Sequence, residues 1–335
     1  MPDAITMTNG RAEMAYVGAK PWHGLGSELT RDASVDTWIQ EAGMDWEIKR
    51  SFVRYTTDRG DTGEIKSFND HVVLFRSDTK DALSIVSQKY HVVQPRDVLE
   101  FFRDLCEYND FELETAGTLF GGKRFWALAN VGEESYVRDK QDKIRGRLLL
   151  ATACDGTMKT VAKFVAERVV CSNTLAIGLS ERGASEVKVS HRSVFHPDRV
   201  KTNLGVVHEG FDKFMDDMNE LAEVDLKTRD VEDLSIALFT KKSVDDARRV
   251  PKVERIELLD SRPFHMISAL YFGAGKGSTL PGAAGTLFGW LNAVTEYTDH
   301  RAQARSDENR FNASLFGPGD AAKSRAYDIA KSFKK

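Results

Sequence analysis

The spacing of apolar residues changes along the chain, and this change constrains the fold more than any other feature. Between residues 46 and 191, short runs with a period of two are separated by glycine-containing turns, which is typical of antiparallel strands. Beyond about residue 195, apolar residues recur every three or four positions, as in amphipathic helices. Strands followed by helices predict an α+β architecture. We expect a β-rich α+β core domain over residues 1–200 and a mainly helical domain over residues 201–335, with the boundary near 195–205.

The first part is expected to hold antiparallel β-hairpins with packed helices. Hairpins are predicted over residues 46–78, 111–131 and 143–170, with Gly121-Gly122 and Asp155-Gly156 at the last two turns. Further strands are predicted over 82–94 and 185–191, and helices over 34–43, 95–109 and 171–183. The remainder of the first forty residues looks irregular. The helical part is predicted to hold helices over 197–224, 231–239, 252–272, 284–303 and 320–333.

Composition is that of a soluble globular protein, with 41% apolar and 29% charged residues. No apolar run approaches the roughly 18 residues of a membrane span, and the first residues lack a signal-peptide pattern. Three cysteines (Cys106, Cys154 and Cys171) form no C-x-x-C motif, which favours a reducing compartment. We therefore expect a cytoplasmic protein with no membrane association.

A glycine-rich run with Lys276 inside it precedes the last-but-one predicted helix and invites comparison with a phosphate-binding loop. That motif needs a serine or threonine directly after its lysine, to bind magnesium, and a strand before it. Gly277 follows the lysine here, and the preceding residues favour a helix. The run is therefore interpreted as a connector rich in Gly, Ser and Pro.

Charge is distributed unevenly. Residues 140–168 contain seven basic and three acidic side chains, whereas residues 209–234 contain ten acidic and three basic ones. A basic middle segment can pair with phosphates of a nucleic acid, although two ordinary solvated faces would look the same. The candidate nucleic-acid-binding residues are Arg145, Arg147, Lys159, Lys163 and Arg168, with Lys123 and Arg124 as secondary candidates.

The pairing register of the 143–170 hairpin decides whether these bases gather. A two-residue turn places Arg147 across from Phe164 and Lys163 across from Leu148, which divides the bases between two faces. A loop one residue longer or shorter brings them to one face, and the sequence leaves both open. Aromatic residues interleaved with bases would suit the stacking of unpaired nucleotides, but aromatic strand residues are more often core. The aromatic residues are Phe52, Tyr55, Phe68, Phe120, Phe125 and Trp126, and the interleaved bases are Arg50, Arg54, Lys66, Lys123 and Arg124.

An enzymatic alternative uses acid–base or metal chemistry. Asn292, Glu296 and His300 recur every four residues, so they share a face of a helix, and Asp155 could join them if the helical part folds back. The other histidines that could complete a metal site are His23, His191, His196 and His208, none with zinc-type spacing. Three further residues or pairs have a functional and a structural interpretation, and the structural one is favoured for each. Cys171 is a buried thiol more readily than a nucleophile, and Asn173 a helix-start residue more readily than a catalyst. Trp22-His23 belongs to a packed loop more readily than to a ligand-binding one.

Five motifs carry a family resemblance: "KPWHGLG", "YHVVQPRDVLEFF", "ETAGTLFGGKRFWALANV", "CDGTMKTVAKFVAERVVCSNTL" and "GTLFGWLNAVTEYTDH". They resemble, in the same order over nearly the whole chain, the prokaryotic phage/plasmid-like protein family, a domain-of-unknown-function family. The family usually has His-Asp-Gly where this chain has Cys154-Asp155-Gly156, so an enzyme centred on that histidine would lack it here. In topology only, the order of hairpins and helix is similar to the single-strand annealing proteins of the Red-beta and eukaryotic Rad type.

The resemblance implies a role in replication, recombination or a contest with host defence on phages and plasmids. Our leading hypothesis is a single-stranded DNA-binding protein of the host-cell cytoplasm that promotes annealing or DNA recombination. It would need no cofactor or metal and would act as a homo-oligomer, in a ring if it resembles the annealing proteins. The alternatives are a nucleic-acid-processing enzyme that uses Asp155, Glu296 and His300, and an interaction protein that blocks a host defence factor.

Overall fold

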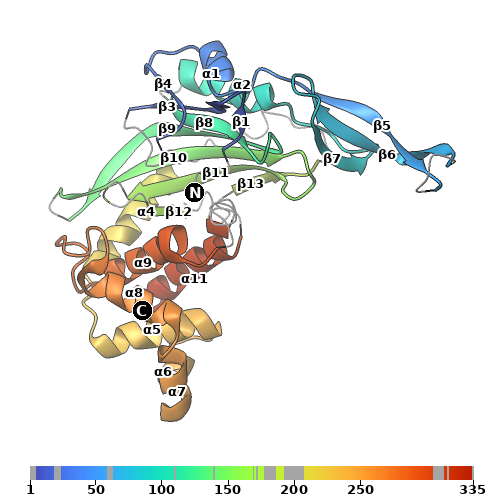
Figure 1. The fold of residues 1–335 in the computed structure, drawn as a ribbon. Helices are drawn as coiled ribbons and strands as arrows, with labels where there is room; N and C mark the ends of the chain where they lie inside the picture. Colours follow the sequence, from blue (N-terminus) through green and yellow to red (C-terminus); the bar gives the residue numbers. More distant parts are fainter. Residues whose placement is uncertain are drawn as a thin grey trace. The chain divides into compact units, whose positions relative to one another are not determined.

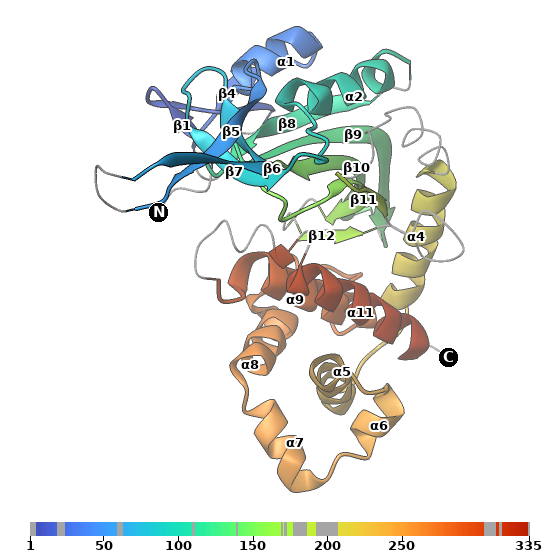
Figure 2. The same ribbon diagram turned by 90° about the vertical axis from the view of Figure 1, so that its right-hand side faces the viewer.

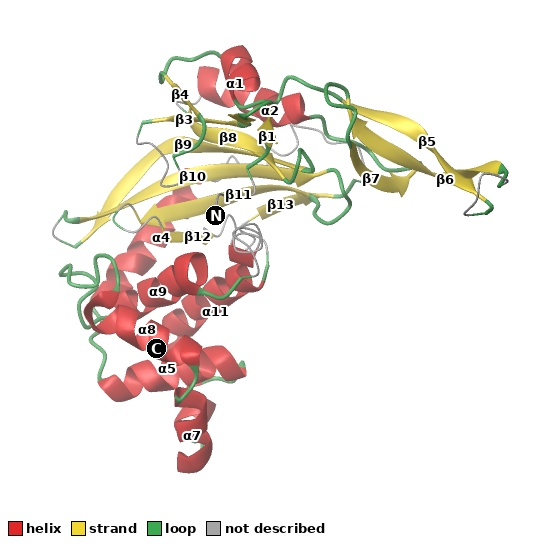
Figure 3. Cartoon of the chain, in the orientation of Figure 1, coloured by secondary structure: helices red, strands yellow, loops and turns green. Residues whose placement is uncertain are grey.

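The computed structural model describes residues 5–18, 24–58, 63–108, 111–138, 140–168, 170, 173–176, 186–191, 207–304, 313–314 and 317–333. Their contacts define two compact units. Unit 1 comprises Met1–Gly132, Arg147–Lys163 and Glu186–Gly205, and unit 2 comprises Glu133–Gly146, Phe164–Ser185 and Val206–Lys335. The α+β class is confirmed, because strands with two helices fill most of the N-terminal half and helices fill the C-terminal half (Figure 3).

The main sheet runs in the hydrogen-bonding order β12-β11-β10-β9-β8-β3-β4, and β13 also pairs with β11. Its strands are β3 (Met14–Val17), β4 (Ser27–Leu29), β8 (Glu112–Leu119), β9 (Arg124–Val137), β10 (Asp142–Ala153), β11 (Thr160–Arg168), β12 (Asn173–Ala176) and β13 (Glu186–Val189). A second, two-stranded pairing joins β1 (Met7–Thr8) and β2 (Arg11–Ala12). The early residues are therefore less irregular than predicted: β3 pairs with β8 and β4, but strands this short leave no visible period.

Among the described residues of unit 1 there are two helices, and both were predicted. In α1 (Val35–Glu41), the Ser34 hydroxyl caps the helix by accepting a hydrogen bond from the Thr37 N–H (3.1 Å). Helix α2 (Pro95–Tyr108) begins at a proline, whose missing N–H costs nothing in the first turn. Its buried face includes Val98 and Phe102, both 0% exposed, and the helix contacts β8 (Figure 2).

A separate antiparallel sheet in unit 1 has the order β5-β6-β7, with β5 (Ile48–Thr56), β6 (Ile65–Arg76) and β7 (Ala82–Ser87). This confirms the hairpin predicted over residues 46–78. Arg76, 2% exposed, anchors the inner end of the sheet: it donates to Glu13 Oε2 (3.1 Å) and lies 4.0 Å from the centre of the Trp46 ring. Because β7 pairs only with His71–Phe75, the outer halves of β5 and β6 continue as a two-stranded ribbon (Figure 1).

Among the described residues, the helices of unit 2 are α4 (Val207–Ala222), α5 (Thr228–Thr240), α6 (Val244–Arg248), α7 (Lys252–Leu259), α8 (Arg262–Ala269), α9 (Leu287–Glu296) and α11 (Pro318–Phe333). Single π-helical turns follow α8 (η1, Leu270–Ala274) and α9 (η2, Tyr297–Arg301). Helix α9 lies in the core, with Leu287 and Trp290 at 0% exposure, and packs beside α11 (Figure 2). The helix predicted over 252–272 is divided, because Ser261 caps a new helix that has a proline in its first turn.

The structure decides one question that the sequence leaves open, the loop length of the 143–170 hairpin, and one local prediction is wrong. Strand β10 ends at Ala153 and β11 begins at Thr160, so residues 154–159 form a longer loop in place of a two-residue turn. Thr152 Oγ1 and Thr160 Oγ1 lie 2.8 Å apart, so even-numbered residues of the two strands share a face and Arg147 and Lys163 share the other. The helix predicted over 171–183 is contradicted at Asn173–Ala176, which pair with Val165–Arg168 as strand β12. Backbone pairing with β11 overrides the local helical preference there.

Candidate nucleic-acid interface

The predicted cations along β10 and β11 are matched by carboxylates or buried. Arg147 Nε lies 2.6 Å from Glu114 Oε2, with the two side chains 15% and 21% exposed. Arg145 Nε lies 3.8 Å from Glu134 Oε2, which also pairs with Lys143 (2.5 Å). Lys163 is 1% exposed. A phosphate would have to displace a carboxylate or open the sheet to reach these groups, so they are poor first contacts, and their role in binding stays a prediction.

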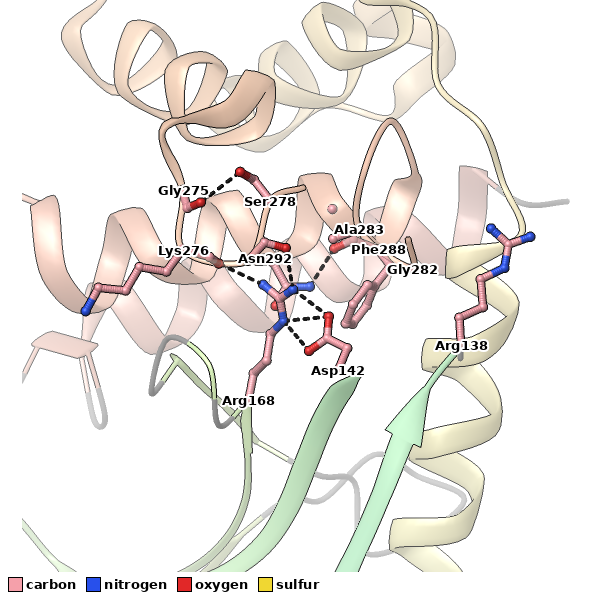
Figure 4. Close-up of polar contacts among 12 residues, drawn as sticks. Arg138, Asp142, Arg168, Gly275, Lys276, Ser278, Gly282, Ala283, Phe288 and Asn292 are labelled. Carbon is pink, nitrogen blue, oxygen red and sulfur yellow. Dashed lines mark hydrogen bonds and ion pairs between the residues drawn. The ribbon is translucent and has the colours of Figure 1, made fainter. Parts of the chain in front are cut away.

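Arg168 is a buried candidate that forms an ion pair and hydrogen bonds within unit 2 (Figure 4). Its Nε donates to Asp142 Oδ1 (2.7 Å), and the two side chains of this ion pair are 4% and 1% exposed. Its Nη1 donates to the Lys276 carbonyl (3.2 Å) and its Nη2 to the Gly277 carbonyl (2.8 Å). The guanidinium also lies 5.4 Å from the centre of the Phe288 ring. Arg168 therefore holds the glycine-rich run in place within unit 2.

Two consecutive backbone amides of the glycine-rich run are already bonded within the protein. The Lys276 N–H donates to the buried Glu296 carboxylate (2.9 Å), and the Gly275 N–H donates to the Leu270 carbonyl (3.1 Å). A negative group of the protein itself thus occupies the amide that a phosphate would need. The preceding residues form α8 and η1, which confirms the expected helix and excludes the strand that the phosphate-binding motif requires.

Lys123 and Lys159 lie on two adjoining loops of unit 1, and Arg124, the first residue of β9, directly follows Lys123. The first loop joins β8 to β9 and the second, residues 154–159, joins β10 to β11. The Cys154 N–H donates to the Lys123 carbonyl (2.9 Å), which fixes one loop against the other. Arg124 Nη2 donates to Thr157 Oγ1 (2.9 Å), and its guanidinium lies 4.6 Å from the centre of the Phe120 ring. Lys159 is exposed, and Lys123 and Arg124 are half-buried.

Local contacts hold these two loops in a defined shape. Asp155 Oδ1 accepts from the Thr157 N–H (2.9 Å), which folds the second loop on itself. His191 Nε2 lies 3.1 Å from the Met158 carbonyl oxygen, next to Lys159, and burial lowers the pKa of His191. In the first loop Gly122 has φ +87°, and a Cβ there would lie 2.7 Å from the Trp46 ring. The cations therefore lie on a fixed backbone.

Five of the six aromatic residues of the predicted hairpins separate into two groups, and the sixth, Phe120, is half-buried. Phe125 and Trp126 are core residues, 1% and 9% exposed. Phe52, Tyr55 and Phe68, on the β5–β6 hairpin, are 71%, 49% and 46% exposed. Aromatic and basic residues alternate in the sequence of both groups. This pattern does not indicate which aromatic side chains become buried and which stay exposed to solvent.

The residues of the enzymatic alternative do not form a metal site: among the described residues, no group of three or more His, Cys, Asp or Glu side chains could hold a metal ion. Asp155 stabilises its own loop. Glu296 is 3% exposed and holds the Lys276 N–H, whereas His300 is exposed. Asn292, on the same helix, donates to the Phe288 carbonyl (2.8 Å). Each contact is accounted for by packing within its own unit.

The remaining candidates are structural or lie outside the described residues. Trp22, His23, Cys171 and His196 belong to the latter group, as does the side chain of His208. Asn173 is a strand residue of β12. Cys154 is 2% exposed, and burial raises the pKa of its thiol to about 12. Such a thiol is inert at neutral pH.

Much of the acidic segment 209–234 forms ion pairs within unit 2. Glu223 pairs with Arg138 (2.8 Å), Asp233 with Arg255 (2.6 Å) and Asp217 with Lys331 (2.8 Å). No helix of the described chain is long and apolar enough to cross a membrane.

Comparison with known proteins identifies the family. The sequence profile described as "Domain of unknown function (DUF932)" matches residues 82–316, so the chain belongs to this family. The match covers β7, the last strand of the β5-β6-β7 sheet, together with both basic loops and most of unit 2, and it leaves out β5 and β6. No curated protein and no solved structure matches the chain.

Proposed function

We propose that this member of the DUF932 family binds single-stranded DNA with unit 1 and promotes strand annealing or recombination for a phage or plasmid. It does so as a homo-oligomer, with base pairing between strands as the only bond-forming event and therefore without a cofactor. The proposal is supported by one observation above all: Lys123, Arg124 and Lys159 lie on or directly beside two adjoining loops, while cations deeper in the sheet are matched by carboxylates.

The two loops suit a phosphate backbone for three reasons. A guanidinium has five N–H donors, and Arg124 uses one of them on Thr157 in the contacts described above. Lysine on an exposed loop, as at position 159, keeps its hydration and can exchange water for a phosphate oxygen without breaking the fold. The backbone of both loops is fixed by local contacts, so little conformational entropy is lost on binding.

Salt dependence of binding tests the proposal. Each phosphate contact to a single strand contributes about −0.7 to the slope of log affinity against log salt concentration. We expect a slope of about −2 from the three loop cations, increasing to about −3.5 if Arg54 and Lys66 of the β5–β6 hairpin also bind phosphates. Fluorescence anisotropy with a labelled deoxythymidine oligonucleotide measures this slope for the full chain.

A triple variant, Lys123→Ala, Arg124→Ala and Lys159→Ala, should bind more weakly and lower the slope by about 2. Arg31→Ala is the matched control, because it removes an exposed charge (side chain 76% exposed) elsewhere in unit 1. Annealing is measured with two complementary oligonucleotides that carry a fluorescence donor and an acceptor. A wild-type protein that shows no salt-dependent binding to single strands contradicts the proposal.

A further inference from the structure

The outer half of the β5–β6 hairpin is exposed on both faces. It consists of Val53–Thr56 paired with Ile65–Phe68, and all of these residues except Val53 are exposed. A two-stranded ribbon without a hydrophobic face gains little stability of its own. Its large apolar side chains, Tyr55 (49% exposed), Ile65 (69%) and Phe68 (46%), and the adjoining Phe52 (71%), therefore do not serve the folding of this ribbon. Such exposure marks a surface that meets a partner.

The strand register places two aromatic rings and a cation on one face of the ribbon. Tyr55 pairs with Lys66 and Val53 pairs with Phe68, so Tyr55, Lys66 and Phe68 share a face. Tyr55 and Phe68 are diagonal neighbours, for which a separation of about 7–8 Å is usual. A base stacked between two rings needs about 7 Å, twice the spacing of roughly 3.4 Å between stacked bases. The Phe68 ring is also stacked on His71, at 5.2 Å between centres, which fixes its orientation.

The charge on the ribbon suits a polynucleotide better than an apolar protein surface. Lys66 separates the two rings, so the face is not a continuous apolar patch. Its ion pair with Glu64 is exposed (53% and 77%) and 3.3 Å long, and such pairs exchange readily with a phosphate. Arg54, opposite Ser67, places a second cation on the other face of the ribbon.

A strand from a second copy of the chain is an alternative partner for this hairpin. In the order β5-β6-β7, strand β5 is at an edge, where an unpaired backbone could accept another strand. Lys49, Arg50 and Arg54 lie along that edge, and basic residues on edge strands oppose such pairing. An evenly apolar edge would favour self-association, whereas this edge carries three basic residues.

We propose that the outer half of the β5–β6 hairpin is a base-stacking arm. Tyr55 and Phe68 hold unpaired nucleobases between and against their rings, and Lys66, on the same face, contacts a neighbouring phosphate. The choice of ligand rests on the proposed function, while the site is separate from the two basic loops. Stacking gives affinity with little dependence on sequence, since every base has a π-face.

Two oligonucleotides of equal length and charge test the arm. The first is a labelled deoxythymidine strand of about 20 residues, and the second has the same backbone with abasic residues. The full-length wild-type protein should bind the first more tightly. Tyr55→Ala and Phe68→Ala should each weaken binding of the base-containing strand by about 5- to 150-fold and leave binding of the abasic strand unchanged. Ile65→Ala removes a similarly exposed but non-aromatic side chain and should change neither.

The outcomes separate this inference from the proposed function. A wild type that binds both strands equally, or aromatic variants that keep the wild-type ratio, overturns the arm and leaves backbone binding in place. A wild type that binds neither strand overturns both proposals. Aromatic variants that dissociate an oligomer without changing the ratio identify a subunit contact in its place. Photocrosslinking of wild-type protein to 5-iododeoxyuridine supplies a measurement without any variant: the modified peptide should contain Tyr55 or Phe68, and modification elsewhere overturns the arm.

Discussion

The cations of the long strands and those of the loops and the β5–β6 ribbon lie in opposite environments. Arg147 and Arg168 face carboxylates within the folded protein, and Lys163 is 1% exposed. Lys159 and Lys66, in contrast, are exposed. A buried cation paired with a carboxylate contributes to a fixed structure and contributes no field at the surface, whereas an exposed one can recruit an anion. Much of the excess positive charge of residues 140–168 is therefore paired with carboxylates or buried inside the folded protein.

The largest expected effect concerns the buried pair. Arg168→Met leaves the Asp142 carboxylate, 1% exposed, without its guanidinium and leaves the Lys276 and Gly277 carbonyls without their donor. Removing one partner of a buried ion pair costs about 3–5 kcal/mol of unfolding free energy, which urea denaturation measures. Arg138→Met is the matched control, because that arginine pairs with Glu223 while the side chains are 39% and 63% exposed. Its cost should be about 0–1 kcal/mol, and equal costs for the two variants contradict the comparison.

A smaller loss is expected where the first basic loop approaches the core. Gly122→Ala introduces a Cβ at φ +87°, 2.7 Å from the Trp46 ring and 2.9 Å from Arg76 Nη1. Backbone strain of about 1–2 kcal/mol and a similar cost of overpacking predict a loss of about 2–4 kcal/mol. Gly121→Ala has φ +68° and open space around its Cβ, so it should show the backbone cost alone. Thermal or urea unfolding separates them, and a loss at Gly121 as large as at Gly122 disproves the close approach.

The sequence predicts an element well when the residues that determine it are neighbours in the sequence, and poorly when they are far apart. Helix α2 begins at Pro95 and repeats apolar residues at helical spacing, so its start and its buried face were both predictable. The Arg168 site was not, since its partners lie 26 and 109 residues away in the sequence. The face of Arg147 depended on the length of one loop, because a one-residue change reverses every side chain of a strand. The exposure of Phe68 against the burial of Trp126 depends on which sheet is covered, which no local pattern records.

The comparison predicts unequal effects on DNA binding from charge removal. Lys159→Ala should weaken single-strand binding about 5-fold at 0.1 M salt, the value that a slope of about −0.7 per contact gives relative to 1 M. Arg147→Met removes a cation that is 15% exposed and paired with Glu114, and should leave the salt slope unchanged. Because Arg147→Met also unpairs Glu114, its stability is measured in parallel and binding is compared at a temperature where both variants are folded. An equal change of slope for the two substitutions would show that the strand cations also reach the DNA.

The smallest effect tests whether an exposed cation is held back by its neighbour. Glu64→Gln removes the carboxylate 3.3 Å from Lys66 and keeps the side-chain shape. An exposed pair of this kind contributes about 0.2–1 kcal/mol, so release of Lys66 should tighten single-strand binding by about 2-fold at low salt. The gain should vanish at high salt, because screening weakens the Lys66–phosphate and Lys66–Glu64 contacts alike. Glu47→Gln, which removes a comparable exposed carboxylate 3.8 Å from Lys49 at the base of the hairpin, is the control and should change binding less. If Glu64→Gln weakens binding, or if the control gives the larger gain, Lys66 does not contact the nucleic acid and the arm binds by its rings alone.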